Sequence, residues 1–203
     1  TYEAGSIRLI SNPTGIYAKE PVVFYKLVQL MKEAGERVVI QSPYVVCNAY
    51  MREQLTSLKE AVPDVKILLN SVENGDNFVA SSDYLRNKDK ILNTGIPLYE
   101  YDGGISNHAK SILIDDDLSV IGSYNLDLRS SYLDTELMLV VESRELNQEL
   151  GGYMEEMEAD SRRALPDGTY EVPEHVTVEE VPFWKRAAWS VVGFLLQPFR
   201  MLV

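Results

Sequence analysis

Apolar and polar residues recur along the chain in two patterns, and each pattern predicts one kind of element. Short apolar runs bounded by turn residues predict strands at residues 6–11, 37–41, 65–70, 96–101 and 135–142. Apolar residues three and four positions apart predict helices after Pro21, from about Asn48, over 76–93 and over 146–157. Strands that alternate with helices of ten or more residues are typical of α/β proteins. We therefore predict an α/β/α sandwich with a mixed, largely parallel central sheet flanked by helices.

The same patterns divide the chain into three parts. Residues 1–163 carry all the strong strand and helix signals and are expected to form one domain. Residues 164–182 are polar and rich in glutamate, which predicts an acidic connector, with room for a short hairpin. Residues 183–203 are predicted to form an amphipathic C-terminal helix.

The C-terminal stretch supports two interpretations. Its tryptophans, phenylalanines and three basic residues suit a helix that lies in a bilayer interface. The same residues also suit a helix that packs on another part of the protein or in a dimer. No run of 18 or more apolar residues occurs, so the sequence predicts no membrane-spanning helix and, with the first interpretation, a peripheral membrane contact.

Charge and cysteine content narrow the class of protein. The 203 residues carry a net charge of -12, which argues against nucleic acid as a partner, because such binding depends on Lys and Arg contacts to phosphates. The single cysteine, Cys47, cannot form a disulfide within the chain, so a cytoplasmic location is expected. Cys47 is interpreted as a core or loop thiol, and no metal or other cofactor is predicted.

One stretch gathers the residue types of phosphate-ester chemistry in the spacing H-x-K-x4-D-x6-G-S-x-N. Its members are His108, Lys110, Asp115, Gly122, Ser123 and Asn125. If the motif is a hairpin closed by a two-residue turn at 116–117, pairing sets Lys110 opposite Ser123 and His108 opposite Asn125. Strand alternation then places these four side chains on one face. The plain alternative is an amphipathic hairpin with surface polar residues.

The predicted patch suits phosphoryl chemistry. An imidazole such as that of His108 can attack phosphorus or protonate a leaving oxygen. Lys110, Ser123 and Asn125 can stabilise charge on the phosphoryl oxygens. Asp115 points to the opposite face, so we expect it to position other catalytic groups and not to attack.

The motif resembles the HKD motif of the phospholipase D superfamily without a gap. Further similarity, to bacterial cardiolipin synthases, rests on Ser42-Pro43-Tyr44, Leu69-Asn70-Ser71, Asp76-Asn77, Tyr84, Arg86, Gly95, Tyr99-Glu100, residues 125–130 and Thr135-Glu136. The resemblance implies that His108 and Lys110 are catalytic and that Ser123 and Asn125 contact phosphate. It also implies that Glu136 bonds the second nitrogen of the histidine, a partner that a histidine in acid or base work needs.

The superfamily uses two HKD motifs, and this chain carries one. The other histidine, His175, has Thr177 where the motif needs lysine, and it is interpreted as a solvated bystander. Two explanations remain open: an N-terminal HKD half precedes Thr1, which the start without Met favours, or two copies form a homodimer. Alone, the chain is expected to be inactive.

The resemblance implies a phosphatidyl transferase that makes cardiolipin from phosphatidylglycerol and a second phospholipid through a phosphohistidine, at the cytoplasmic membrane. An alternative with the same site is a phosphodiesterase that hydrolyses lipids or nucleic acid. A third hypothesis, from another class, is a noncatalytic scaffold that keeps the motif as a fold element. The intact motif argues against the scaffold.

Overall fold

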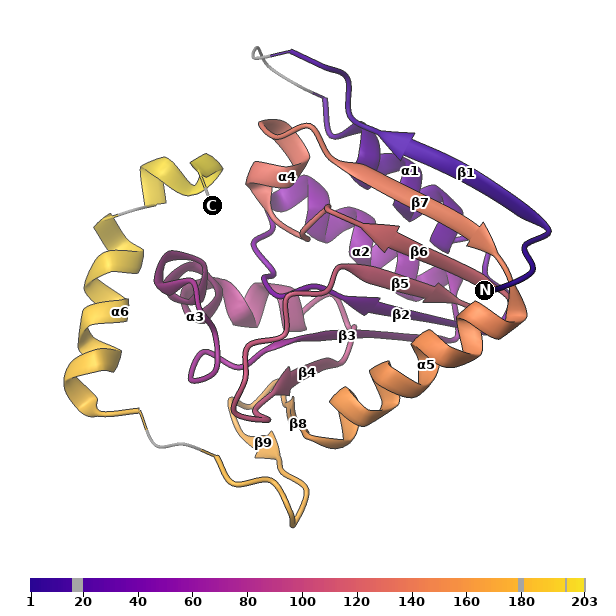
Figure 1. Ribbon diagram of the computed structural model, residues 1–203. Coiled ribbons are helices and arrows are strands. Elements are labelled where there is room, and N and C mark those ends of the chain that lie inside the picture. The colour runs from indigo at the N-terminus through magenta and orange to yellow at the C-terminus, as the bar shows by residue number, and fades with distance from the viewer. Residues whose placement is uncertain (16–19, 179–180, 196, 203) are drawn as a thin grey trace.

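The computed structural model describes residues 1–15, 20–178, 181–195 and 197–202. Strands are β1 (Ser6–Ser11), β2 (Arg37–Gln41), β3 (Asp64–Asn70), β4 (Leu98–Tyr101), β5 (Ser111–Ile114), β6 (Leu118–Gly122), β7 (Leu137–Glu142), β8 (Ser161–Ala164) and β9 (Tyr170–Glu171). Helices are α1 (Val22–Met31), α2 (Ala49–Ala61), α3 (Phe78–Leu92), α4 (Leu128–Tyr132), α5 (Arg144–Ala159), α6 (Phe183–Leu195) and the 3-10 helix η1 (Gln197–Leu202). Figure 1 shows the strands as one sheet with helices in front and behind.

The strands form one mixed sheet in the order β1-β7-β6-β5-β2-β3-β4-β8-β9. The mixed sheet flanked by helices confirms the predicted fold class, but "largely parallel" was wrong. Only β2–β3 and β3–β4 are parallel among the eight pairings of the described strands. The two parallel pairs are those whose strands are joined by the long helices α2 and α3, since a parallel pair needs a crossover that returns the chain to the same edge of the sheet.

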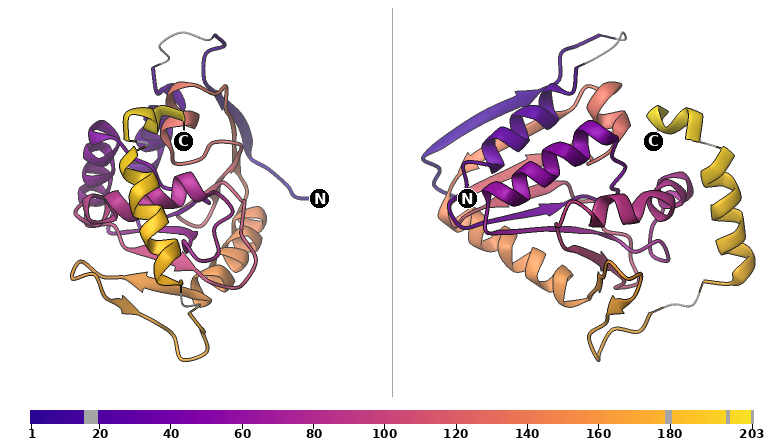
Figure 2. Two further views of the ribbon diagram at one scale, coloured as in Figure 1. Left: turned by 90° about the vertical axis from the view of Figure 1, so that its left-hand side faces the viewer. Right: turned by 180° about the vertical axis from the view of Figure 1, so that it is seen from behind.

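Helices cover the two faces of the sheet unequally. On one face α1 and α2 lie over the strands, as the view from behind shows (Figure 2), and the main core includes Phe24, Leu55 and Ile67. On the other face α5 contributes Met154 and Met157 to a smaller cluster with strand residues. Leu150, Met154 and Met157 of the predicted helical stripe thus pack inward, whereas Tyr153 of the same stripe is exposed.

Four helices begin at a side chain that accepts hydrogen bonds from the free N–H groups of the first turn. The capping residues are Asn48 for α2, Asn77 for α3, Asp127 for α4 and Ser143 for α5. Such caps fix where a helix starts. They therefore also fix the loops that lead from β2, β3 and β6 into α2, α3 and α4. These three strands end at one edge of the sheet, which we call the carboxyl edge.

Part of the sheet surface beside α5 has no helix over it. Exposed apolar side chains gather there on β1, β6 and β7, and they are Ile7, Leu9, Ile121, Leu137 and Leu139. Leu9 and Ile121 each pair with Leu139, so these three side chains lie in one row across the strands. We call these five residues the bare sheet face; Figure 1 shows its strands uncovered in front.

The C-terminal part of the chain differs from its prediction in detail. The predicted connector, 164–182, contains β9, which pairs with β8, and its residues 179–180 lie outside the described residues. The predicted helix over 183–203 ends as an α-helix at Leu195, and η1 follows. Pro198 lacks the N–H that a continued α-helix would use. Residues 196 and 203 lie outside the described part, and the domain boundaries stay a prediction.

Helix α6 packs on α3 with one side only. Trp189 is buried and stacks on Phe78 at 5.8 Å between ring centroids. Arg200, in η1, bonds both carboxylate oxygens of Asp83 at 2.5 and 2.9 Å. Large apolar side chains of α6 remain exposed, and they are Phe183, Trp184, Val191, Phe194 and Leu195. Phe199, in η1, is exposed as well. Within the described segments, no helix has the length and apolarity needed to cross a bilayer.

Candidate active site

The motif hairpin has a three-residue turn and not the predicted two-residue turn at 116–117. Ile114 pairs with Leu118, so the turn comprises residues 115–117. Asp115 adopts φ 51°, the left-handed region that Asp tolerates better than most residues. The extra residue shifts the register by one, so Lys110 opposes Gly122 and not Ser123. The Gly122 N–H donates to the Lys110 carbonyl at 3.1 Å.

Gly122 is required by this close pairing. A Cβ at this position would lie 2.1 Å from the Leu137 carbonyl oxygen and 2.6 Å from the Met138 sulfur. A backbone oxygen cannot give way as a flexible side chain can, so a larger residue would force β6 and β7 apart. The glycine therefore keeps the end of β6 tight against β7, immediately before Ser123.

His108 and Lys110 precede β5 and are not part of the strand that the motif predicted. His108 is exposed, and its ring meets the ring of Tyr44 edge to face at 5.9 Å. Lys110 is half-buried, and its ammonium donates to the His108 carbonyl at 2.7 Å. Burial lowers the pKa of Lys110, while the charges of Asp127 and other nearby carboxylates act in the opposite direction. The site thus holds a cation surrounded by acids.

Ser123 and Glu136 are bonded to each other. The Ser123 hydroxyl donates to one carboxylate oxygen of Glu136. The hydroxyl of Ser130 donates to the other oxygen at 2.7 Å. Glu136 is buried, so these two donors supply hydrogen bonds that water would otherwise give. Within the described residues, Glu136 makes no hydrogen bond to the imidazole of His108, and its predicted orienting role stays a prediction.

Asn125 is held beside this network through its backbone. Its N–H donates to the Ser130 hydroxyl at 3.2 Å, and Asp127 accepts from the Ser130 N–H at 2.7 Å. Burial raises the pKa of Asp127, against the hydrogen bonds from Ser130 that lower it. The Asn125 side-chain oxygen is buried and has no hydrogen-bond partner in the described chain. This oxygen can only accept a hydrogen bond, so a phosphate oxygen, which is also an acceptor, would have to bond the amide nitrogen of Asn125.

Asp115 lies at the other end of β5. Its carboxylate accepts the backbone N–H groups of Gly35, Glu36 and Arg37, at 2.9, 2.9 and 3.0 Å. Four strand residues separate it from Lys110, which is a span of roughly 17 Å at strand geometry. The structure thus does not bring Asp115 together with His108, Lys110, Ser123 and Asn125. It anchors the loop between α1 and β2.

The structure adds residues for which the sequence predicted no role. Tyr44 contacts His108, and its hydroxyl donates to Asp76 at 2.6 Å. Asn70 donates to the Asn107 carbonyl at 2.8 Å and accepts from the Asn107 N–H at 2.9 Å, which holds the backbone next to His108. Asp127-x-x-Ser130 is a helix-capping spacing, so the sequence carried a signal for α4 and for these two residues.

Other candidate groups lie apart from this cluster. Cys47 is buried, and burial raises the pKa of its thiol to about 12, so it is not a nucleophile at neutral pH. His175 is exposed, with its Nε2 3.3 Å from Asp160. Among the residues that the structure describes, no three His, Cys, Asp or Glu side chains are grouped to hold a metal ion.

At the carboxyl edge, the loop that carries the exposed His108 and the half-buried Lys110 is bonded to the end of β6, directly before Ser123 and Asn125. An imidazole can act as a general acid or a general base. The ammonium, the hydroxyl and the amide can bond the oxygens of a phosphate group as charge develops there. This set suits the transfer of a phosphoryl or phosphatidyl group.

Comparison with known proteins gives a family match over most of the chain. The family model described as "Cardiolipin synthase, PLD-like domain" matches residues 27–158. Cardiolipin synthase A of Yersinia pseudotuberculosis serotype O:1b is 29% identical over 165 residues, and that of Yersinia pestis is equally similar. These alignments cover 80% of this chain but 32% of the relatives. The aligned region is thus about a third of the length of the curated proteins that it matches.

Solved structures share the fold at low sequence identity. Nuc, a phospholipase D family member from Salmonella typhimurium, is 21% identical with a TM-score of 0.61, over 78% of this chain and 97% of Nuc. Phosphatidylserine synthase from Haemophilus influenzae Rd KW20 is 17% identical with a TM-score of 0.65, over 97% of this chain and 48% of the synthase. This similarity shows that the chain has the fold of phospholipase D family structures.

Proposed function

The chain belongs to the family of cardiolipin synthase, PLD-like domains, and we propose that it supplies one half of the active site of a phosphatidyl transferase. The reaction would make cardiolipin from phosphatidylglycerol and a second phospholipid. The observation that carries the proposal is the cluster at the carboxyl edge, where the loop of His108 and Lys110 meets Ser123 and Asn125. Asp115 is left out of the proposed catalytic set because it anchors a distant loop.

Two histidines divide the proposed chemistry. In the first step, the histidine of the other half forms a P–N bond as the bond from phosphorus to the head-group oxygen breaks. His108, protonated, donates its proton to that leaving oxygen. In the second step, neutral His108 takes the proton from a hydroxyl of the incoming phosphatidylglycerol. The hydroxyl oxygen forms a P–O bond as the P–N bond breaks, which releases cardiolipin.

Lys110, Ser123 and Asn125 would bond the phosphoryl oxygens in both steps. The Ser123 hydroxyl has a single proton, which it donates to Glu136, so it would turn this proton to a phosphoryl oxygen when the lipid binds. Glu136 would fix the Ser123 hydroxyl, and Ser130 links Glu136 to the backbone of Asn125. This network supports the proposal because it holds the Ser123 hydroxyl and the backbone of Asn125 in place before a lipid binds. Groups that are preorganised in this way are worth more than mobile ones.

The second half of the site would dock on the bare sheet face. The face is apolar, and its row of Leu9, Leu139 and Ile121 runs beside α5. Ser123 continues the same side of β6 two residues beyond Ile121, so an occupant of the face would reach the active site. The occupant would be an N-terminal HKD half or a second copy of this chain, since both would contribute a histidine.

Docking on this face can be tested with Leu139→Arg. We expect the substitution to disrupt association of the two halves, because it buries a charge against an apolar partner. Tyr153→Arg, at an exposed position on α5, is the matched control. The measurement is sedimentation of the full-length protein and of this chain, with and without the other half. Association that tolerates Leu139→Arg as well as Tyr153→Arg would refute the docking surface.

The outer side of α6 would hold the protein against the membrane. Phe183 and Trp184 are 86% and 70% exposed, and aromatic side chains of this kind favour the lipid interface. Replacing both by serine should weaken binding to phosphatidylglycerol vesicles about tenfold or more, while Tyr153→Ser should leave it unchanged. Unaltered vesicle binding by the double variant would disprove this contact.

The activity itself is tested with His108→Ala in the full-length protein. Cardiolipin formation from labelled phosphatidylglycerol is measured, and we expect it to fall by about 10³-fold or more, since a group that transfers the proton is lost. Wild-type product levels in the variant would sink the proposal. If the wild-type protein released phosphatidic acid in place of cardiolipin, the alternative of a lipid-hydrolysing phosphodiesterase would replace it.

A further inference from the structure

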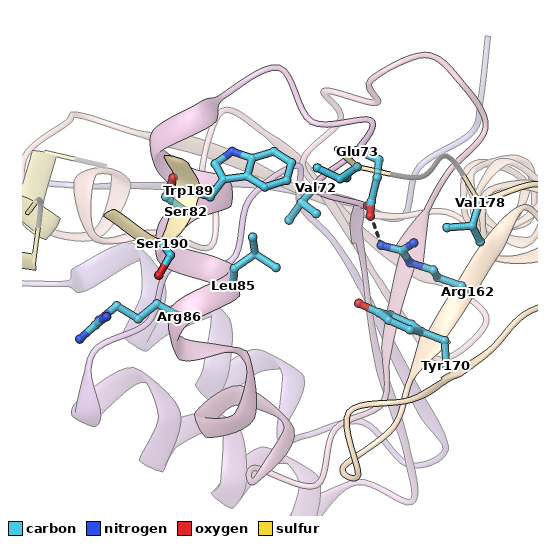
Figure 3. Close-up of a pocket in the computed structure, with 11 residues that line it drawn as sticks. Val72, Glu73, Ser82, Leu85, Arg86, Arg162, Tyr170, Val178, Trp189 and Ser190 are labelled. Atoms are coloured by element: carbon cyan, nitrogen blue, oxygen red, sulfur yellow. Dashed lines mark hydrogen bonds and ion pairs between the residues drawn. The ribbon is translucent and has the colours of Figure 1, made fainter. Parts of the chain in front are cut away.

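A cavity of about 570 Å³ lies beneath α6, between α3 and the β8–β9 hairpin. We call it the α6 cavity, and Figure 3 shows its lining side chains. Leu85 points from α3 into the space between Trp189 and Tyr170. The volume of the α6 cavity falls within the range of about 300–1,000 Å³ that is usual for small-molecule sites. The cavity is therefore large enough to receive part of a substrate.

Most of the cavity wall is apolar. Val72 and Val181 are buried in the wall, Trp189 closes it on the α6 side, and Leu85 remains 39% exposed. An apolar side chain that folding leaves accessible inside a cavity gains stability when an apolar ligand covers it. The wall thus favours a hydrocarbon ligand.

The charged groups at the far end of the cavity neutralise one another. Arg162 bonds Glu73 at 2.6 Å and Glu100 at 3.0 Å, and Lys88 bonds Glu100 at 2.5 Å. The guanidinium of Arg162 also lies over the ring of Tyr170, 4.4 Å from its centroid. In this network two cations and two carboxylates leave no net charge to attract an ion. The remaining charged side chain of the wall, Arg86, lies over the ring of Phe194 in α6, 5.4 Å from its centroid. The end of the α6 cavity beside Arg162 should therefore receive an uncharged part of the ligand.

A second, polar pocket adjoins the α6 cavity on the side of the active site. It has a volume of about 610 Å³, and Glu73 lines both spaces. Gly103, Gly104 and Ser106 line the polar pocket, and Ser106 lies two residues before His108. From His108 outward, the surface thus changes from the phosphate-binding cluster to a polar pocket and then to an apolar cavity.

This order matches the chemical order of a phospholipid, which is phosphate, glycerol ester and acyl chain. We propose that the α6 cavity binds one acyl chain of the phospholipid whose phosphate lies at His108. The inference rests on the proposed function, because it assumes a lipid substrate. It adds a binding site that selects for the apolar part of that substrate, some distance from the reacting atoms.

The test uses Trp189 as a reporter inside the cavity. Trp184→Phe leaves Trp189 as the only tryptophan of the chain, and a lysophosphatidylglycerol with a dibrominated stearoyl chain is added below its micelle concentration. Bromine quenches tryptophan fluorescence on contact. We expect saturable quenching, at least twofold at saturation, which the unbrominated lipid competes away. No quenching of Trp189 would overturn the proposal.

Leu85→Phe, in the same background, fills part of the cavity. It should raise the lipid concentration needed for half-maximal quenching at least tenfold. Leu133→Phe is the matched control, because Leu133 is 40% exposed and lies outside the cavity. Equal quenching in both variants, at equal melting temperature, would overturn the site. Quenching by dibrominated stearate alone, and not by the lysolipid, would overturn the assignment to a phospholipid. The assay measures binding, so a failure of the proposed transfer reaction would leave its result unaffected.

Discussion

The two ends of β5 carry different residues of one motif, and these residues differ in their exposure and in their hydrogen bonds. At the carboxyl edge, His108 is exposed and Lys110 is half-buried among acids. At the opposite edge, the Asp115 carboxylate accepts three backbone N–H groups. The imidazole and the ammonium at the first end can still bond a ligand. The carboxylate at the second end is already bonded to backbone N–H groups of the protein.

This contrast teaches that residues at fixed spacing in a motif need not share a task. His108 and Lys110 lie where a substrate can reach them, whereas Asp115 holds the start of β2 next to the end of β5. Because β2 and β5 pair directly, the bonds of the Asp115 carboxylate also help to set the position of β5 along β2. This position determines where His108 and Lys110 lie at the carboxyl edge. One end would do the chemistry, and the other would place it.

The largest effect is expected for Lys110→Met. Activity of the full-length protein should fall by about 10²–10³-fold, because the variant lacks the ammonium that we propose as a donor to the phosphoryl group. The melting temperature should stay within about 2 °C of the wild type. The reason is that, in the part of the chain that the structure describes, the ammonium donates its hydrogen bond only to the His108 carbonyl, two residues away, and links no separate elements of the fold. Lys26→Met, at an exposed position on α1, is the control. Strong unfolding of Lys110→Met with normal residual activity would reverse the roles of the two ends.

The second test is Asp115→Ala. We expect a loss of about 2 kcal/mol in the free energy of unfolding, because three backbone donors lose a charged acceptor and alanine tolerates the positive φ poorly. The catalytic rate per folded molecule should remain near that of the wild type. Asp116→Ala in the same turn removes only an exposed contact to Arg144 at 3.8 Å and should change stability little. Denaturant melts and rates measured at low temperature separate the two effects.

The smallest effect is the pH dependence at this end of the strand. Burial alone would raise the pKa of Asp115, but hydrogen bonds from Gly35, Arg37 and Glu36 outweigh it and lower the pKa below its ordinary value of 3.8. A carboxyl whose pKa is lower in the folded state stabilises the fold above about pH 4 and loses that effect as the pH falls through the folded value.

Asp115→Asn should therefore be less stable than the wild type by about 1 kcal/mol at neutral pH, and the gap should close as the pH falls below 3.8. Urea melts at pH 7, 4 and 3 measure this difference. A gap that widens on acidification would contradict the anchoring role of the carboxylate.

The sequence predicted most strands and helices correctly because their apolar patterns are long and regular. It did not predict the register of the motif hairpin, because that register depends on a turn of three residues with Asp115 at positive φ. A two-residue and a three-residue turn leave the same alternation in the flanking strands. The direction of the strands was not predicted either, since apolar runs such as those of β5 and β7 do not indicate which neighbour a strand will pair with.

The candidate site was predicted in part for a similar reason. The residue types and spacing identified His108, Lys110, Ser123 and Asn125, all of which lie at the carboxyl edge. The link from Glu136 to Ser130 was not predicted, because it depends on where the short helix α4 returns the chain. Contacts between separate loops leave no periodic trace in a sequence.

The position of β5 between these two ends also explains the length of the motif. Lys110 directly precedes the strand and Asp115 directly follows it, so the four unspecified residues of H-x-K-x4-D are the four residues of β5. The number of residues between Lys110 and Asp115 thus equals the length of the strand at this point of the sheet. An insertion or deletion of one residue within it would turn Ile112 and Leu113 to the wrong faces. Other apolar residues can therefore replace those at these four positions, but a change in the number of positions would destabilise the core.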